Sequence, residues 1–589
     1  MKFGKLVRLS LGLTIPAIAL LLIVFGIPIV LLFLTSFDAP AFSFGNYRAF
    51  FAQPANIRVL VQTIEMSMVA TALCLLVGYP AAYLISSASK QIRTVLIVLV
   101  VMPYLTSLLA RTYAWIVILG DHGLINGFLL YVGLIGSPLP LLYNRFAVYL
   151  GMVHIMLPVM MLPLISVMLG INRSLMAAAR SMGARPSSAF WRVFFPLSLP
   201  GVRSGTLLVF VLCLGFYITP AALGGLRDAM LSSFIAAQVT SSFNLARISA
   251  AAFVLLALAV IVLSFVGVDL SGTQERSQTP STRWSPGRTV GPVVRYLREM
   301  RAARKARRWA ANLYKAESPD RLSSVFSVLF LAAVIGFLLF PGVIVFIMSF
   351  SVGAMLEFPP SGFSLQWYIS FFGDPSWNRA LVASVEIGIA VAAVSTLFGT
   401  LAAYGLNRTG PGLRGLLTML LLTPITFPII VVGIAAYMGL IRLGLIGSMT
   451  GLILAHSVGS IAYVVVIVSA TLANFDRRLE MAARSMKAGP IRTFRRVTLP
   501  LIMPGIVGGA LFAFINSFDE VVISSLVSGL SIRTLPLKMW ENIRHQIDPT
   551  IAAIASMLML LPILWIVAIY ITWWRSNART KPVAVGSVA

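Results

Sequence analysis

Twelve apolar runs, each long enough to cross a bilayer as a helix, constrain this chain of 589 residues more than any other feature. A helix rises about 1.5 Å per residue, so crossing a hydrocarbon core of roughly 30 Å takes about 20 apolar residues. The runs therefore predict an all-α integral membrane protein with about 12 transmembrane helices in two sets of six. They cover 12–34, 60–85, 94–118, 147–170, 203–224 and 249–270, and then 324–350, 380–406, 415–441, 449–473, 506–527 and 551–574.

The composition excludes the other broad classes of protein. Hydrophobic residues make up 59% of the chain and charged residues only 11%, against roughly a quarter charged in a typical soluble domain. A disordered chain would need low hydrophobicity. The first apolar run exceeds the 7 to 15 residues of a cleaved signal core, so we expect it to remain as a membrane helix. Cys74 and Cys213 lie inside apolar runs, which argues against disulfides and thiolate metal sites.

The formal net charge of +27 follows from the predicted topology. With the N-terminus in the cytoplasm, most of the 45 Lys and Arg residues fall in cytoplasmic segments, as the positive-inside rule requires. Both termini are then cytoplasmic. The basic residues thus indicate a bilayer as the partner and give no reason to expect nucleic acid.

An internal duplication relates the two sets of helices. The segment from Leu175 to Val202 aligns without gaps with 479–506 at a constant offset of 304, and about half of the positions are identical. Upstream, GYPAAY from Gly78 matches GTLAAY from Gly399 at an offset of 321. We therefore predict two homologous domains, 1–270 and 323–589, joined by a basic cytoplasmic linker, 271–322.

A short amphipathic helix is predicted in each of the repeated loops, 172–202 and 476–506. Apolar residues recur there at i, i+3, i+4 and i+7, which places them on one narrow helix face. Such a face suits docking into a groove of another protein, although a membrane-surface helix that braces its own bundle is an alternative. A second short segment follows and is expected to end at Pro196 and Pro200, or at Pro500 and Pro504. The face consists of Leu175, Ala178, Ala179 and Met182, and of Leu479, Ala482, Ala483 and Met486.

The loop pattern, two alanines followed by a glycine and a Leu-Pro after the fourth of six helices, resembles the coupling loop of type I ATP-binding cassette importer permeases. That resemblance implies a helix seated in a cleft of a nucleotide-binding subunit. The coupling residues would be Leu175, Ala178, Ala179, Arg180 and Gly183, and Leu479, Glu480, Ala482, Ala483 and Arg484.

Two positions depart from the family pattern. The glutamate before the alanines is replaced by Ala177 and Met481, with Glu480 one residue earlier. Lys487 stands where the first loop has its glycine, so the turn after the second helix is expected to differ.

The two halves resemble different members of this family. GYPAAYLISSASK and ITPAALGG in the first half are similar to the first permease of spermidine/putrescine importers, and FAFINSFDEVVISSLVSG in the second half is similar to the second. The resemblance implies a fusion of two permease subunits in a bacterial inner membrane. It also implies two copies of a separate ATPase subunit, which use ATP and Mg, and an extracytoplasmic binding protein.

No enzyme site is predicted in the chain itself. The sequence lacks the phosphate-binding GxxxxGK[ST] motif and has no HExxH, CxxC or GxSxG motif. We therefore expect no catalytic residue, bound cofactor or metal. A secondary transporter of the major facilitator kind, a passive channel or scaffold, and importers of ferric iron, thiamine, phosphonates or opines remain as alternatives.

Acidic residues inside the predicted spans are the first candidates for the substrate pathway, because such residues are costly in a bilayer. Aromatic side chains could hold a polycationic ligand by cation–π attraction, while ion pairing and ordinary packing are the alternatives. His154 and His456 are expected to form interhelical hydrogen bonds. The pathway candidates are Asp519, Glu520, Glu65 and Glu386, with the aromatic residues Trp115, Tyr217 and Phe216.

Overall fold

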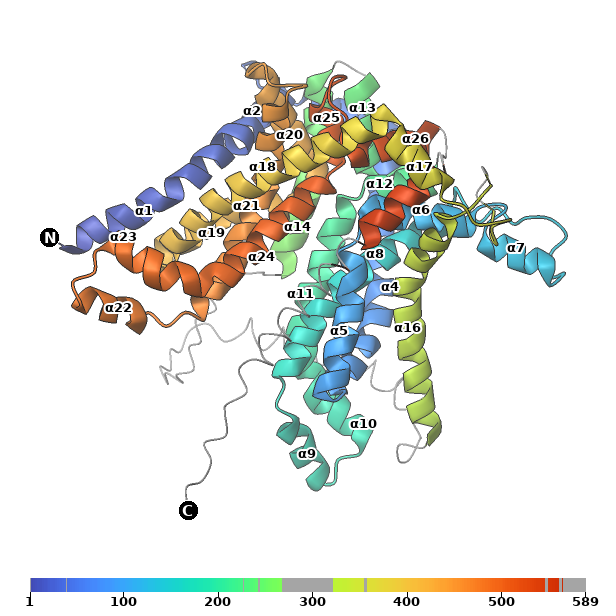
Figure 1. The fold of residues 1–589 in the computed structure, drawn as a ribbon, viewed down its shortest axis with the longest axis horizontal. Helices are drawn as coiled ribbons and strands as arrows, with labels where there is room; N and C mark the ends of the chain where they lie inside the picture. The colour runs from blue at the N-terminus through green and yellow to red at the C-terminus, as the bar shows by residue number, and fades with distance from the viewer. Residues whose placement is uncertain are drawn as a thin grey trace.

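The computed structural model is a bundle of helices (Figure 1) and describes residues 2–38, 40–225, 227–241, 244–266, 321–353, 357–545, 549–560 and 564. Within these ranges β-structure is limited to one isolated bridge between Ser351 and Phe363. Ten helical stretches of the described chain are long and apolar enough to cross a membrane, and a bent pair of helices adds one more.

The first half contributes the helices from α1 to α14. They are α1 Lys2–Leu21, η1 Leu22–Gly26, α2 Ile27–Ser36, α3 Gly45–Ala52, α4 Pro54–Ser87, α5 Lys90–Tyr104, α6 Leu108–Leu119, α7 Leu124–Tyr131, α8 Arg145–Gly170, α9 Arg173–Ser181, α10 Pro186–Ala189, η2 Phe190–Phe194, α11 Phe195–Leu214, α12 Ile218–Leu223, α13 Leu231–Ser241 and α14 Leu245–Val266.

The second half repeats this order from α16 to α26. Its helices are α16 Arg321–Met348, α17 Gln366–Gly373, α18 Pro375–Leu406, α19 Pro411–Thr426, α20 Ile429–Arg442, α21 Met449–Ala473, α22 Arg478–Ser485, α23 Pro490–Thr493, η3 Phe494–Thr498, α24 Leu499–Phe518, α25 Val522–Val527 and α26 Leu535–His545.

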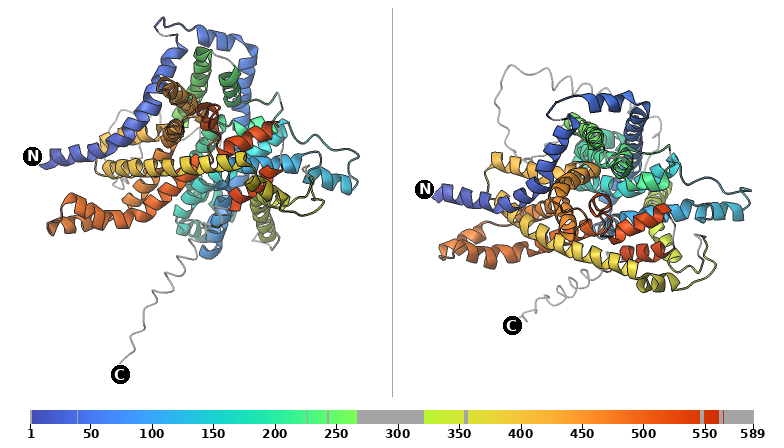
Figure 2. Two further views of the ribbon diagram at one scale, coloured as in Figure 1. Left: turned by 45° about the horizontal axis from the view of Figure 1, so that its top comes forward. Right: turned by 90° about the horizontal axis from the view of Figure 1, so that it is seen from above.

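The first helix of each half packs on the other half. Helix α1 lies along α18, and α16 lies against α4, α5 and α6 (Figures 1 and 2). Helix α2 also contacts α20. The halves are therefore interlocked by their own N-terminal helices.

The duplication is repeated in three dimensions. The Leu231 amide donates to Thr63 Oγ1 over 2.7 Å, and the Leu535 amide donates to Ser384 Oγ over the same distance. The offsets of 321 and 304 relate these two pairs. The sequence repeat therefore extends to individual tertiary hydrogen bonds.

Four predicted spans are broken and not continuous. In 203–224 and 506–527 the long helix ends at Leu214 or Phe518, and a separate short helix, α12 or α25, follows. The other two are 94–118 and 415–441. The first of these two is interrupted between α5 and α6, and α19 and α20 meet at an angle of 102°. Pro103 and Pro424 lie near the ends of α5 and α19, where proline removes a backbone donor. In each half, α6 or α20 therefore begins at a break within the predicted span.

The predicted end of the second loop segment was wrong in both halves. The second loop segment does not end at its prolines, because the helix continues through Pro196 and Pro200, and through Pro500 and Pro504, into the predicted fifth and eleventh spans. A π-helical turn, η2 or η3, precedes each pair of prolines and changes the hydrogen-bond register just before the first proline.

The linker lies outside the described residues except for its last two, and the twelfth span is described to Leu560 and at Leu564.

Candidate coupling loops and translocation cavity

The two loop helices predicted from the repeat are present as α9 and α22. A side chain accepts from a backbone amide at the start of each: Asn172, the N-cap of α9, accepts from the Ser174 amide at 3.0 Å, and Asp476, one residue before the N-cap of α22, accepts from the Arg478 amide at 2.9 Å. Capping stabilises a helix end by satisfying amides that have no partner within the helix.

Matched apolar side chains of α9 and α22 are exposed. Leu175 and Leu479 are each 46% exposed, and Met182 and Met486 are each 83% exposed. Ala178 and Ala482 are exposed beside them, whereas Ala179 is buried and Ala483 is partly buried. The exposed face is thus narrower than the predicted one, because the second alanine of each pair turns toward its own half. The flanking residues Arg180, Gly183 and Arg484 are exposed as well.

The turns after α9 and α22 have the same conformation, contrary to the expectation from Lys487. Gly183 has φ +83° and Lys487 has φ +60°, so both are left-handed. The Ala184 amide donates to the Ala179 carbonyl at 3.0 Å, and the Ala488 amide donates to the Ala483 carbonyl at 3.1 Å. The repeated hydrogen bonds impose this turn even where the residue is a lysine.

Replacing Lys487 with glycine should therefore stabilise the second loop by about 1 kcal/mol, because a left-handed conformation is costly for a residue with a Cβ. Hydrogen exchange of the α22 amides would measure the change. Gly183→Ala is the matched variant in the first loop. A Cβ there would contact nothing, so the substitution should destabilise the first loop only through the cost of the left-handed backbone. Equal exchange in wild type and Lys487→Gly would contradict this account.

A repeat-equivalent arginine ties each loop helix to the end of the second long helix of its half. Arg173 Nη2 donates to the Ser86 carbonyl at 2.5 Å, and Arg477 Nη2 donates to the Asn407 carbonyl. The arginines are related by the offset of 304 and their acceptors by 321. Our sequence prediction missed these contacts, although the repeated arginine was a visible signal.

Glu480 is buried within its own half. Its carboxylate accepts from Arg408 Nη2 at 2.5 and 2.6 Å and from Thr498 Oγ1 at 2.5 Å. Burial raises the pKa of Glu480, but the hydrogen bonds from Thr498 and Arg408 outweigh it, and the pKa is lowered below its ordinary value. The side chain is only 7% exposed, so it holds α22 in place and does not belong to the exposed face.

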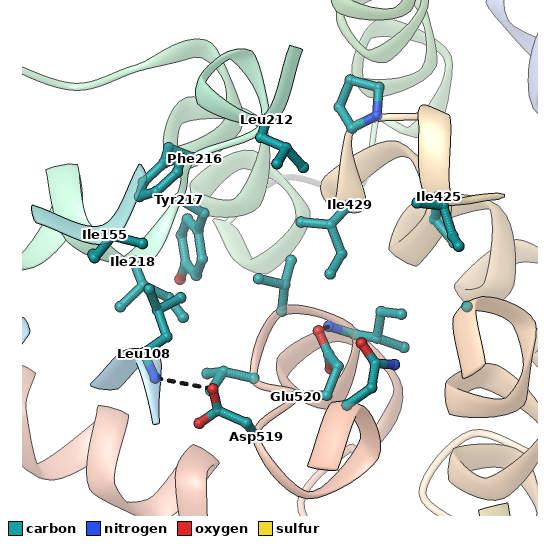
Figure 3. Close-up of a pocket in the computed structure, with 18 of the residues that line it drawn as sticks. Leu108, Ile155, Leu212, Phe216, Tyr217, Ile218, Ile425, Ile429, Asp519 and Glu520 are labelled. Carbon is teal, nitrogen blue, oxygen red and sulfur yellow. Dashed lines mark hydrogen bonds between the residues drawn. The ribbon is translucent and has the colours of Figure 1, made fainter. Parts of the chain in front are cut away.

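A cavity of about 350 Å³ lies between the two halves (Figure 3). Residues related by the repeat line it from both sides: Leu108 with Ile429, Arg111 with Val432, Gly215 with Asp519, Phe216 with Glu520, and Tyr217 with Val521. The cavity therefore lies where equivalent surfaces of the two halves face each other. Its two acids come from the second half and its arginine from the first.

Asp519 joins the halves at the edge of this cavity. Its Oδ1 accepts from Ser107 Oγ at 2.5 Å. Its Oδ2 accepts from the Leu108 amide at 2.9 Å, the contact drawn in Figure 3. Glu520 is held within its own half, because its two oxygens accept from the amides of Ile523 at 3.0 Å and Ser524 at 2.9 Å. Both acids line the cavity, but only Asp519 bridges the halves.

Four of the seven predicted pathway residues, Asp519, Glu520, Phe216 and Tyr217, line the cavity. Trp115 is buried elsewhere, against His154 and Phe337, with ring centroids 5.6 and 5.7 Å away.

The remaining two predicted pathway residues lie on the exposed surface. Glu65 pairs with Arg145 at 3.2 Å, and Arg145 also binds Asp228. Glu386 is exposed on α18. Neither is among the residues that line the cavity.

The predicted role of the two histidines is confirmed. His154 Nε2 lies 3.1 Å from the Leu338 carbonyl of α16, and His456 lies 2.9 Å from Ser517 Oγ and 3.1 Å from Ser524 Oγ. Both rings therefore join helices, although His456 also lines the cavity.

Arg111 is the main cavity residue that our sequence prediction missed. It is 5% exposed, its Nε donates to the Ser107 carbonyl at 3.4 Å, and its Nη1 has no hydrogen-bond partner among the described residues. It lies within range of an electrostatic interaction with Asp519. The cavity thus contains a buried cation beside one buried acid, Glu520, and one partly buried acid, Asp519.

Comparison with known families decides the class of this protein. The family model described as "Binding-protein-dependent transport system inner membrane component" matches the chain twice, at residues 74–272 and 395–575. The chain belongs to this family of permeases. It is accordingly a multi-pass inner-membrane protein that acts as a transport subunit, in a family whose members work with a binding protein and an ATPase.

Two relatives extend the resemblance. The spermidine/putrescine transport system permease protein PotB of Haemophilus influenzae is 35% identical over 210 residues, which cover 36% of this chain and 73% of that protein. The putrescine transport system permease protein PotI of Escherichia coli is 34% identical over 207 residues, which cover 34% of this chain and 73% of that protein. Each alignment covers about one third of this permease and about three quarters of the relative.

Proposed function

We propose that this permease forms both halves of the pore of an ATP-driven polyamine importer. The chain has no ATPase site of its own in this proposal, and two copies of a separate nucleotide-binding subunit grip α9 and α22. An extracytoplasmic binding protein delivers putrescine or spermidine, and the loops and both chain ends lie in the cytoplasm. The names of the two relatives favour this class of substrate.

The pair of loop helices is the observation that carries the coupling part of this proposal. The same leucine and methionine positions are exposed in both halves, and equivalent arginines tether both helices. A brace for the bundle alone would gain nothing from exposing two methionines at 83%. Two equivalent faces suit two equivalent partner subunits.

The cavity supports the choice of a cationic solute. Two carboxylates and the rings of Tyr217 and Phe216 lie around one volume between the halves. Carboxylates can replace the water of an ammonium group, and aromatic faces attract cations.

Reconstitution into vesicles tests the proposed function directly. The permease, its cognate ATPase and the binding protein should accumulate labelled putrescine or spermidine only when ATP is present on the loop side. Accumulation of another solute, such as ferric iron, thiamine, a phosphonate or an opine, would replace polyamines as the substrate. Equal accumulation by the permease alone, from a solute gradient and without nucleotide, would contradict the importer mechanism.

A further inference from the structure

The N-terminus of α6 is capped by a residue of the other half. Ser107 is the N-cap residue of α6, but its hydroxyl makes no bond to its own helix. The hydroxyl donates to Asp519, and the same carboxylate accepts from the Leu108 amide, the first amide of the helix. A carboxylate is favourable at a helix N-terminus and unfavourable at the C-terminus, where Asp519 ends its own helix α24. Asp519 is therefore stabilised across the interface.

The duplicated position shows that this contact is specific to one side. Gly215 is the equivalent of Asp519, and a Cβ there would lie 3.3 Å from Pro428 Cα and 3.5 Å from the Ile429 amide nitrogen. The contact of Gly215 with the start of α20 is thus close backbone packing, whereas the equivalent contact of Asp519 with the start of α6 is made by a charged side chain. Separation of the halves would remove two hydrogen bonds from Asp519 but none from Glu520, whose donors move with it.

We propose that Asp519 is a shared carboxylate that caps α6 when the halves are closed at the cavity and binds an ammonium group of the solute when they separate. This inference rests on the proposed function. Separation takes both donors away from the partly buried carboxylate of Asp519, which can then bind a cation in a cavity lined by aromatic rings. Closure returns Ser107 and the α6 amide to Asp519 and expels the cation.

Arg111 favours the same direction of exchange. Its guanidinium lies one turn beyond Ser107, on the half that approaches Asp519 during closure. The free Nη1 of this side chain brings positive charge into the closed cavity. On closure, the positive charge of Arg111 repels the ammonium group of the solute while Asp519 returns to the N-terminus of α6.

Three variants of the full complex in vesicles separate the two roles of Asp519. Ser107→Ala removes one donor but keeps the carboxylate, and Asp519→Asn keeps an acceptor for the Leu108 amide but removes the charge. Thr106→Val is the matched control, because the Thr106 hydroxyl donates to the Pro103 carbonyl of its own half. The readouts are ATP hydrolysis without binding protein or solute, and uptake of labelled putrescine with both present.

A hydrogen bond to a charged group contributes enough for a shift of about tenfold in a two-state equilibrium. Ser107→Ala should therefore raise solute-free hydrolysis about tenfold, as closure at the loops accompanies separation at the cavity. Asp519→Asn should reduce putrescine uptake about a hundredfold, and because it also weakens the cap on α6, it should raise solute-free hydrolysis toward the level of Ser107→Ala.

Two results would overturn the inference. Hydrolysis by Ser107→Ala that equals that of Thr106→Val removes the capping role, and unchanged uptake by Asp519→Asn removes the binding role. If wild type moves no polyamine while Ser107→Ala still raises hydrolysis, the proposed substrate and the ammonium role fail together. The cap between the halves would then stand alone.

Discussion

Tryptophan at both Ala178 and Ala482 should abolish ATP-driven uptake, with a loss of at least about a hundredfold. Both alanines are exposed on α9 and α22, beside leucines that are 46% exposed. An indole at the centre of each narrow face would hold a partner subunit away from the helix backbone, and packed interfaces tolerate little added volume. Co-purification of the ATPase with the variant permease, followed by vesicle uptake, measures both consequences.

The matched control replaces the same alanines with serine. Ala178→Ser with Ala482→Ser keeps the close approach and should leave uptake within about threefold of wild type. Each single tryptophan variant should retain one gripped loop and lose only part of the association. If the double tryptophan variant binds the ATPase and transports as the serine variant does, the exposed faces do not dock the ATPase, and the bundle-bracing alternative gains support.

The membrane class and the duplication could be predicted from the sequence because both are one-dimensional signals. Apolar length determines which segments can cross a bilayer, and a constant offset reveals the repeat. The loop helices could be predicted from apolar residues that recur at i, i+3, i+4 and i+7 in both repeats. The family match and the exposed faces of α9 and α22 agree with those predictions.

Tertiary contacts account for most of what the sequence did not reveal. The break between α5 and α6 follows a proline, but several prolines inside other helices produce no break, as in α8 with Pro158 and Pro163. Hydropathy cannot separate the two cases, because neighbouring helices decide whether a freed carbonyl finds a partner. The packing of α1 on α18 likewise leaves no periodic signal.

The cavity was predicted in part. The rule that intramembrane charges mark function found Asp519, and the same rule applied to cations would have found Arg111 inside the predicted span 94–118. The rule also selected Glu65, which pairs with Arg145 outside the cavity. Burial and partners distinguish these residues, and neither is encoded at the position itself.

Arg408→Ala should destabilise the second loop more than any other single substitution there, by about 3 kcal/mol. The side chains of Arg408 and Glu480 are 17% and 7% exposed, so removal of the arginine leaves a buried carboxylate without its charge partner. The arginine also stacks on the ring of Tyr404, 3.4 Å from its centroid. Hydrogen exchange of the α22 amides should become about a hundredfold faster, because 1.4 kcal/mol corresponds to a tenfold change in an opening equilibrium.

Neutralising Glu480 in the same chain should restore much of that loss. Arg408→Ala with Glu480→Gln removes the uncompensated charge and keeps an acceptor for Thr498, so exchange should return to within about tenfold of wild type. Arg484→Ala, an exposed arginine of the same helix, is the control and should change exchange less than threefold. Equal exchange in Arg408→Ala and Arg484→Ala would show that the ion pair does not hold the loop.

The pH dependence of exchange gives an independent check on the same pair. The pKa of Glu480 is lowered in the folded loop, so its contribution is complete above the unfolded value of roughly 4.3. It is lost only as the pH falls through the lower folded pKa. Wild-type protection should therefore stay constant between about pH 8 and pH 5.5. Arg408→Ala leaves the Thr498 hydrogen bond but removes the arginine that also lowers the pKa. Acidification should therefore protonate Glu480 earlier and slow the exchange of α22 relative to neutral pH, after correction for the intrinsic rate.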